Sequence, residues 1–179
     1  MVARGAVSGA VRPGPAGPLP RGPRSPAGGG DGADADAAAE RRIGYVGHHP
    51  GLYPELTSKE NLELFCALYG LPRRRAAEAL AGVGVDPGLT ARGRELSRGT
   101  QQRVALARSL LHDPELWILD EPDASLDARG RSLLEGAAGS RTVVIATHDR
   151  DLAGSLCGRA FQLRDGRLEA RPPLEVLRS

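Results

Sequence analysis

The segment that decides the fold runs from Leu96 to Asp127 and reads LSRGTQQRVALARSLLHDPELWILDEPDASLD. It holds a turn of small residues that leads into a predicted helix, then an apolar run that ends in two adjacent carboxylates, Asp120 and Glu121, and then a tight turn. An apolar run of this length is typical of a buried strand. Because parallel α/β sheets gather their ligands at the carboxyl ends of strands, the carboxylate pair indicates phosphate and Mg²⁺ chemistry.

Helix and strand signals alternate on both sides of this segment. The spacing of Val104, Ala107 and Leu111 predicts a helix from about Thr100 to His112. The apolar run 116–119 predicts a strand that is buried on both faces, and this alternation of elements predicts an α/β fold with parallel core strands. The other expected elements are a strand at 43–46, helices after Thr57 and after Pro72, a helix at about 128–138, a strand at 142–146, a helix at 149–157 and a hairpin over 161–168.

Composition divides the chain into three parts. Alanine, glycine and proline make up 25 of the first 40 residues, and such a segment cannot bury enough apolar surface to offset its ordering entropy. We therefore predict a disordered leader over 1–40, a folded domain over 41–170 with a helical subdomain at about 57–95, and a loose tail over 171–179.

Charge and cysteine content narrow the class of protein. The net charge of +2 favours neither a nucleic-acid partner nor an anionic membrane surface. Two cysteines, Cys66 and Cys157, are too few for a disulfide framework or a zinc site, and we expect both to be buried thiols. No run approaches the ~20 apolar residues of a membrane span, and no signal-peptide pattern follows the start. We expect a soluble, cytoplasmic chain.

The two carboxylates are expected to have different roles. Successive side chains at a strand end point to opposite sides, so one carboxylate can hold Mg²⁺ and the other can act on an attacking water. His148 follows the second predicted strand in the same layer, where an imidazole can donate to a phosphoryl oxygen. Ser97 and Gly99 open a helix, whose exposed amides bind anions. Taken singly, these residues are also compatible with ordinary helix caps, surface acids or a loop histidine.

In this order and spacing the motifs resemble those of the nucleotide-binding subunit of ATP-binding-cassette (ABC) transporters. The segment LSRGTQQR, Leu96 to Arg103, is similar to the signature L-S-G-G-Q-x-Q-R, with Arg98 and Thr100 as departures. Residues 116–121 resemble Walker B, Ser125-Leu126-Asp127 the D-loop, Thr147-His148-Asp149 the H-loop, and 44–61 the Q-loop region, where His48 stands in place of glutamine.

The resemblance implies a set of roles and partners. Glu121 is the implied general base, His148 and His48 assist catalysis, and Asp120 engages Mg²⁺. The implied ATP-binding residues are Ser97, Arg98, Gly99, Thr100, Gln101 and Asp127. The implied partners are a membrane permease subunit and a second ATPase subunit in a head-to-tail homo- or heterodimer, at the inner face of the cell membrane. A narrower similarity, in Gly-His-x-Pro-Gly and Leu-Ser-Arg-Gly-x-Gln-Gln-Arg, is to the haem-exporter ATPase of c-type cytochrome biogenesis.

One part of the family pattern has no counterpart in this sequence. The phosphate-binding loop G-x-x-x-x-G-K-[ST] needs a lysine, whereas the one lysine here, Lys59, is followed by Glu60 and lies after the Q-loop region. The resemblance thus predicts a partial P-loop NTPase-like domain without its amino-terminal third. Three functions stay open: an ATPase that powers transport, a subunit that offers its signature segment to an intact partner, and a remnant without function.

Overall fold

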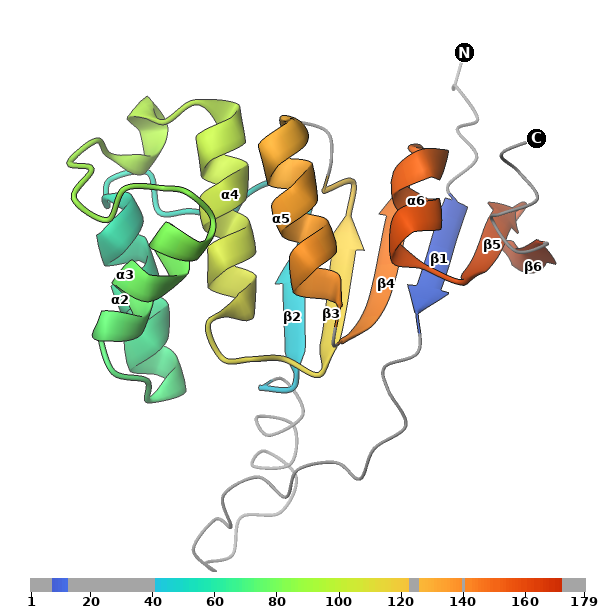
Figure 1. Cartoon of the computed structure of the whole chain (residues 1–179), viewed down its shortest axis with the longest axis horizontal. Helices are drawn as coiled ribbons and strands as arrows, with labels where there is room; N and C mark the ends of the chain where they lie inside the picture. The colour runs from blue at the N-terminus through green and yellow to red at the C-terminus, as the bar shows by residue number, and fades with distance from the viewer. Residues whose placement is uncertain (1–7, 13–40, 123–125, 140, 172–179) are drawn as a thin grey trace, which may run out of the picture.

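The computed structural model describes residues 8–12, 41–122, 126–139 and 141–171. Its strands form one six-stranded sheet in the order β2-β3-β4-β1-β5-β6. In Figure 1, α5 and α6 lie in front of the strands and α4 lies beside β2. The elements are β1 Ser8–Arg12, β2 Ile43–Val46, α2 Ser58–Tyr69, α3 Arg74–Gly82, a 3-10 turn Gly93–Glu95, α4 Arg98–Leu110, β3 Leu116–Asp120, α5 Ala128–Ala138, β4 Thr142–Thr147, α6 Arg150–Leu156, β5 Arg159–Arg164 and β6 Arg167–Arg171.

The predicted parallel core is confirmed. Strand β3 lies between β2 and β4 and pairs with both in parallel. Its side chains alternate, however, because Trp117 and Leu119 are buried whereas Leu116 and Ile118 are only half-buried. The prediction of burial on both faces was therefore wrong for this strand. The apolar run reflects one face packed under helices and another that water partly reaches, and sequence hydrophobicity does not distinguish the two.

The amino-terminal segment departs from its prediction at one place. Ser8–Arg12 forms strand β1, which pairs antiparallel with β4 on one side and with β5 on the other. A disordered leader was expected here because the segment is poor in large apolar residues. Ladder hydrogen bonds use backbone groups, so a proline-free stretch of small residues can still occupy a position between two strands. The rest of the predicted leader and the tail from residue 172 lie outside the described residues, and the division into domains stays a prediction.

Local signals placed most helix ends. Thr57 and Glu60 form the predicted capping box at the start of α2, and Gly70 ends this helix in the left-handed region with φ 68°. Helix α4 begins at Arg98 rather than at about Thr100, because the Ser97 side chain accepts a hydrogen bond from the amide of Thr100. The predicted hairpin over 161–168 is confirmed, with its turn at Asp165 and Gly166.

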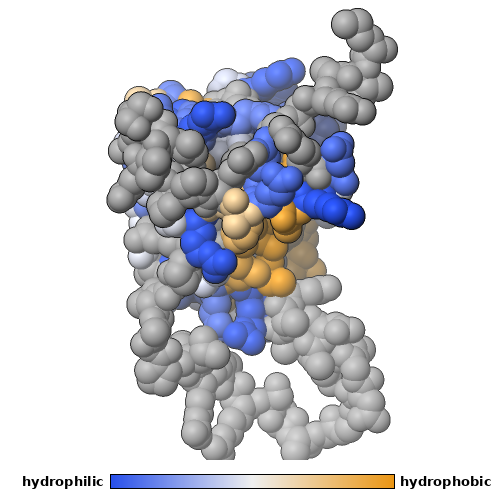
Figure 2. Space-filling model, turned by 90° about the vertical axis from the view of Figure 1, so that its right-hand side faces the viewer, coloured by the Kyte–Doolittle hydropathy of each residue, from blue (hydrophilic) through white to orange (hydrophobic). Residues whose placement is uncertain are grey.

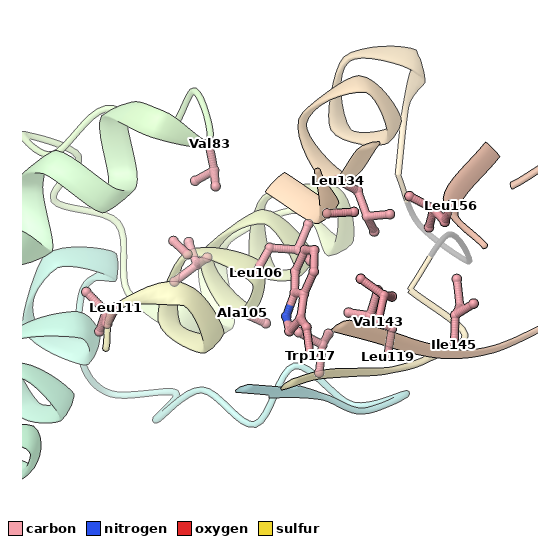
Figure 3. Close-up of a cluster of buried hydrophobic side chains, with 14 of the residues drawn as sticks. Val83, Ala105, Leu106, Leu111, Trp117, Leu119, Leu134, Val143, Ile145 and Leu156 are labelled. Carbon is pink, nitrogen blue, oxygen red and sulfur yellow. The ribbon is translucent and has the colours of Figure 1, made fainter. Parts of the chain in front are cut away.

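The core lies between the sheet and the helices that cover it. Its largest fully buried side chain is Trp117, whose indole Nε1 donates to Ser109 Oγ of α4 at 2.9 Å. Leu119 and Ile145 continue the core along β3 and β4, as Figure 3 shows. Both cysteines are buried, as predicted. Apolar side chains also reach the surface on the side of the molecule that Figure 2 presents, where they form a patch among hydrophilic ones.

The close packing of β2 against α4 gives a prediction for Gly44. A Cβ at this position would lie 2.5 Å from the backbone oxygen of Ser109 and 2.7 Å from Cγ of Pro114, so neither neighbour can yield cheaply. We expect Gly44→Ala to lower the free energy of unfolding by about 1–3 kcal/mol, measured by urea denaturation. Gly136→Ala is the matched control, because nothing lies within 4 Å of its added Cβ. Gly136→Ala should raise the free energy of unfolding by up to about 1 kcal/mol. Equal effects of the two substitutions would show that the packing around Gly44 is not the cause.

The surroundings of His112 predict how the stability of the fold depends on pH. Its ring stacks on Tyr69 at 4.3 Å between centroids, and Nε2 lies 3.1 Å from the carbonyl oxygen of Ile43. Burial lowers the pKa of His112, against opposing contributions from the Ile43 carbonyl and Asp113. A group with a lowered pKa in the folded state contributes stability above its unfolded pKa of about 6.5, and this stability is lost as pH falls from there toward the folded pKa.

We therefore expect the wild-type chain to lose stability as pH falls below about 6.5, and His112→Gln to lose less over the same fall in pH. Urea denaturation at several pH values measures both. His49→Gln removes an exposed imidazole and should leave the wild-type pH dependence in place. A His112→Gln variant with an unchanged pH profile would show that another group controls it.

Candidate functional site

The centre of the site is a contact between Glu121 and His148. His148 Nε2 lies 3.2 Å from Glu121 Oε1, with 60% of the histidine side chain and 23% of the glutamate side chain exposed. The two residues follow β3 and β4, which are neighbouring parallel strands whose ends are in register at Asp120 and Ala146. The sheet therefore brings together, at one edge, two side chains that lie 27 positions apart in the sequence.

The backbone of Glu121 is held in an uncommon conformation. Its φ is 47°, which is in the left-handed region, and its amide donates to the carbonyl oxygen of Ala146 at 2.8 Å. Gln102 of α4, which is 5% exposed, donates from Nε2 to the carbonyl oxygen of the next residue, Pro122, at 3.4 Å. A non-glycine residue in this region is strained and needs surrounding contacts to keep it there. These two hydrogen bonds fix the direction in which the Glu121 carboxylate leaves the strand.

Next to Glu121 lies a polar pocket of about 280 Å³. It brings together four predicted site residues from three separate segments, namely His48, Arg98, Gln101 and Glu121, and Gln102 and His49 complete the wall with Pro50. The rings of His48 and His49 meet edge to face at 5.2 Å. One arginine, two histidines and two glutamines thus line the pocket together with a single carboxylate, a set that can bind a polar ligand with anionic groups.

The amino end of α4 has polar partners of its own. Ser97 Oγ accepts from the amide of Thr100 at 3.2 Å and lies 2.9 Å from Thr100 Oγ1. The Gln101 side chain donates to the carbonyl oxygen of Gly93 at 2.7 Å. These contacts give Ser97 and Gln101 a structural role as cap and brace, while Gly99 lies in the first turn of the helix. That they also bind a nucleotide stays a prediction.

Two more aspartates of the motifs act as helix caps. Asp127 Oδ1 accepts from the amide of Gly130 at the start of α5, and Asp149 Oδ1 accepts from the amide of Leu152 at the start of α6. The Leu152 amide and the Arg131 guanidinium, 2.5 Å from Asp149 Oδ2, lower the pKa of Asp149. Arg131 of α5 therefore holds the residue that follows His148. Ser125 of the predicted D-loop lies outside the described residues.

Sequence reasoning did not single out three residues that shape this region. These are Gln102, which supports Glu121, Arg131, which holds Asp149, and Asn61, which ties the segment after the histidines to α2. The sequence carries one weak signal for the first of them, since Gln102 lies within the signature segment 96–103. Arg131 and Asn61 become visible only when their partners are placed.

The predicted metal ligand, Asp120, is half-buried at the end of β3. Among the residues that the structure describes, no group of three or more histidine, cysteine, aspartate or glutamate side chains is placed to hold a metal ion. Mg²⁺ keeps several waters and is usually bound through one or two carboxylates together with substrate phosphates. A single aspartate at the edge of the sheet fits that mode of binding.

The position of the one lysine is also relevant. Lys59 lies in the first turn of α2, where its Nζ is 3.9 Å from Glu63 Oε1. It is not among the residues that line the polar pocket. In the described chain this lysine is part of a surface pair on a helix, which accounts for it without a ligand.

The fold and the site define an α/β protein with a carboxylate–histidine pair at the carboxyl ends of parallel strands. A family model described as ABC transporter matches residues 25–124, which include residues 25–40 of the predicted leader. The chain is 40% identical over 138 residues to the lipoprotein-releasing system ATP-binding protein LolD of Syntrophus aciditrophicus (strain SB), an alignment that covers 72% of this chain and 61% of that protein. The chain belongs to the ABC transporter family.

Further relatives differ in what their names say they transport. Over 143 residues the chain is 41% identical to the Fe(3+) ions import ATP-binding protein FbpC 1 of Rhodococcus jostii (strain RHA1), covering 73% of this chain and 40% of that protein. Over 151 residues it is 37% identical to the macrolide export ATP-binding/permease protein MacB of Nitrosomonas europaea, an alignment that covers 78% of this chain and 22% of that protein. The chain thus spans about three fifths of the length of these relatives at most.

Solved structures agree with the fold. The ATP-binding cassette MJ0796, in a dimeric post-hydrolysis state bound to ADP and Pi, superposes with a TM-score of 0.68 at 31% identity, covering 80% of this chain and 68% of that one. The predicted ABC ATPase fold, α/β with parallel core strands and helices, is therefore confirmed. Within the described part of the chain, no helix has both the length and the apolarity that a membrane span needs.

Proposed function

We propose that this chain is the ATP-binding subunit of an ABC transporter and couples ATP hydrolysis to transport across a membrane. The observation that carries the proposal is the 3.2 Å contact between Glu121 and His148 beside the polar pocket. A carboxylate next to an imidazole, at the mouth of a pocket with an arginine and amide side chains, is an arrangement for activating water against a phosphoryl group.

Each site residue then has a role. Glu121 accepts a proton from the attacking water, and its fixed backbone keeps the carboxylate pointed at that water. His148 contacts the Glu121 carboxylate and donates a hydrogen bond to an oxygen of the transferred phosphoryl group. His48 contributes a further imidazole from the lining of the polar pocket. Asp120 would hold Mg²⁺, which when bound neutralises charge on the phosphates. Arg98, Gln101 and the amides at the amino end of α4 bind phosphate oxygens.

The partners follow from this function. The subunit works at the inner face of the cell membrane, docked on a membrane permease subunit, and pairs with a second ATPase subunit as a homo- or heterodimer. The family relatives include importers and exporters, so the direction of transport needs its own evidence. The finer proposal of haem export rests on the loop Gly47-His48-His49-Pro50-Gly51 and the segment 96–103. Haem bound by the purified complex would support it, and a complex that binds other cargo alone would remove it.

A second candidate function is favoured by the position of Lys59. Because the one lysine of the sequence pairs with Glu63 on α2, the nucleotide would be held by the phosphate-binding loop of another subunit. In this alternative the chain is an ATPase-deficient partner that offers the amino end of α4, with Ser97 and Gly99, to ATP on an intact ATPase.

Photolabelling with an azido analogue of ATP separates the two candidates. The chain is purified alone and together with the membrane and ATPase subunits that co-purify with it. Labelling of the isolated chain supports the first candidate and contradicts the second, whereas labelling that needs an intact ATPase subunit supports the second. Arg98→Glu should lower labelling because it reverses charge in the polar pocket, and Arg167→Glu, on exposed β6, is the matched control. No labelling in either preparation would refute both.

A further inference from the structure

A second cavity, of about 280 Å³, lies among α3, α4 and α5 on the helical side of the sheet. Its floor is formed by Trp117 and Leu134, which are 0% and 1% exposed, and by Leu106 of α4. Figure 3 shows these three side chains grouped together, with Val83 across from them at the end of α3. The cavity shares no lining residue with the polar pocket, so it is a separate feature of the molecule.

Apart from Arg75, Glu78 and the indole of Trp117, the side chains that line the cavity are aliphatic. Ala79 and Gly82 on one side and Ala137 on the other leave the space open because their side chains are small or absent. An apolar cavity of about 150 Å³ stays dry and binds benzene. Scaled by volume, the present cavity accepts an apolar body of roughly ten carbons. Burial of such a body removes apolar surface of both partners from water, which is the driving force for binding.

Charged side chains at the rim of the cavity determine which head group a bound ligand can carry. Glu78 is 3.6 Å from the guanidinium of Arg74, which offsets its charge. Arg75 donates from Nη2 to the carbonyl oxygen of Leu111 at 3.2 Å, and within the described ranges no carboxylate lies within ion-pair distance of it. Arg75 is also exposed, so its remaining N–H groups are free to reach a ligand at the cavity mouth. The rim therefore favours an anion.

We propose that this cavity binds a medium-chain amphipathic carboxylate, with an aliphatic body of roughly ten carbons against Trp117 and its carboxylate on Arg75. The site does not rest on the proposed ATPase function. It connects α3, α4 and α5, and the amino end of α4 lines the polar pocket. A ligand in the cavity thus lies between α4, which begins at Arg98, and the neighbouring helices α3 and α5.

Trp117 makes the test direct because it is the one tryptophan of the sequence and forms the cavity floor. Decanoate is titrated into the full chain below its micellar concentration, and tryptophan emission is recorded. We expect a saturable change with one site per chain. Decylammonium, which has the same body and the opposite charge, should bind at least ten-fold more weakly, and Arg75→Gln should weaken decanoate binding by a similar factor. Equal binding of the two amphiphiles would overturn the assignment of the head group.

A pair of glycine variants tests the location. Gly82 lines the cavity and Gly136 does not, and nothing lies within 4 Å of a Cβ added at either helical position. Gly82→Leu fills the cavity and should abolish the decanoate response, whereas Gly136→Leu should keep the wild-type affinity. Ala137→Leu fills the cavity from α5 and serves if Gly82→Leu fails to fold, as judged by circular dichroism. Wild-type binding in a folded cavity-filling variant, or no saturable response in the wild type, would overturn the proposal.

Discussion

Replacing Glu121 by glutamine is expected to slow ATP hydrolysis by about 10²- to 10⁴-fold in a complex that contains this chain. Glutamine keeps the shape and the hydrogen bond to His148 but cannot take a proton from the attacking water. The backbone of residue 121 is held by Ala146 and Gln102 rather than by its own side chain, so the fold should be unchanged. Phosphate release under saturating ATP measures the rate, and the KM for ATP should stay close to that of the wild type because general-base catalysis acts in the transition state.

Glu78→Gln is the control for this substitution. Glu78 is exposed, pairs with Arg74 in the described structure and does not line the polar pocket, so its loss should leave hydrolysis unchanged. Gln102→Leu tests whether the hydrogen bond from α4 to Pro122 supports Glu121. It keeps the buried volume but releases the carbonyl of Pro122, and we expect a lower rate without loss of nucleotide photolabelling. Full activity in Glu121→Gln would mean that the water is activated elsewhere, for example in the partner subunit.

Replacing Asn61 by aspartate is expected to lower the free energy of unfolding by about 3–5 kcal/mol, the cost of an uncompensated buried charge. Asn61 is 0% exposed, and its Nδ2 donates to three backbone carbonyl oxygens, those of Tyr53, Leu56 and Thr57, at 2.9–3.2 Å. Oδ1 accepts from the amide of Tyr53 at 2.8 Å. Aspartate has the same shape, so packing is kept, but it turns an oxygen toward three other oxygens.

The pH dependence identifies the cause of this loss. Burial and the three carbonyls raise the folded-state pKa of the introduced carboxyl above its unfolded value of about 3.9. The deficit should therefore shrink as pH falls through the raised pKa, since the protonated carboxyl can donate one hydrogen bond. Urea denaturation at pH 7 and pH 5 measures this. Asn61→Ala, which leaves the carbonyls unpaired without adding charge, should cost about 1–3 kcal/mol. An aspartate variant as stable as the alanine variant would contradict the electrostatic explanation.

The sequence predicted the local features of the fold well, but it missed features that depend on distant parts of the chain. Helix ends such as Thr57 with Glu60, and the turn at Asp165-Gly166, were predicted because their signals act within a few residues. Strand β1 was missed because its position depends on β4 and β5, which lie more than 130 residues away. The burial of β3 was overestimated for the same kind of reason, since the cover on each face comes from distant elements.

The candidate site shows the same division. The residue types at positions 120, 121 and 148 and their places after apolar strands were legible in the sequence, because a strand end and its polar residues are contiguous. That His148 contacts Glu121, and that His48 and Arg98 share a pocket with it, required the parallel pairing of β3 with β4 and the packing of α4 beside them.

The sequence by itself indicated the family and the order of the elements from residue 43 onward, and it predicted residues that could handle phosphate. Only the tertiary structure decided which of these residues meet, that Gln102 and Arg131 support them, and that small side chains on α3 and α5 leave a cavity over Trp117. The physical reason is one of range. Capping, turn formation and strand propensity are set by neighbours in the chain, whereas contacts, burial and cavities are set by the packing of elements that the chain separates by tens of residues.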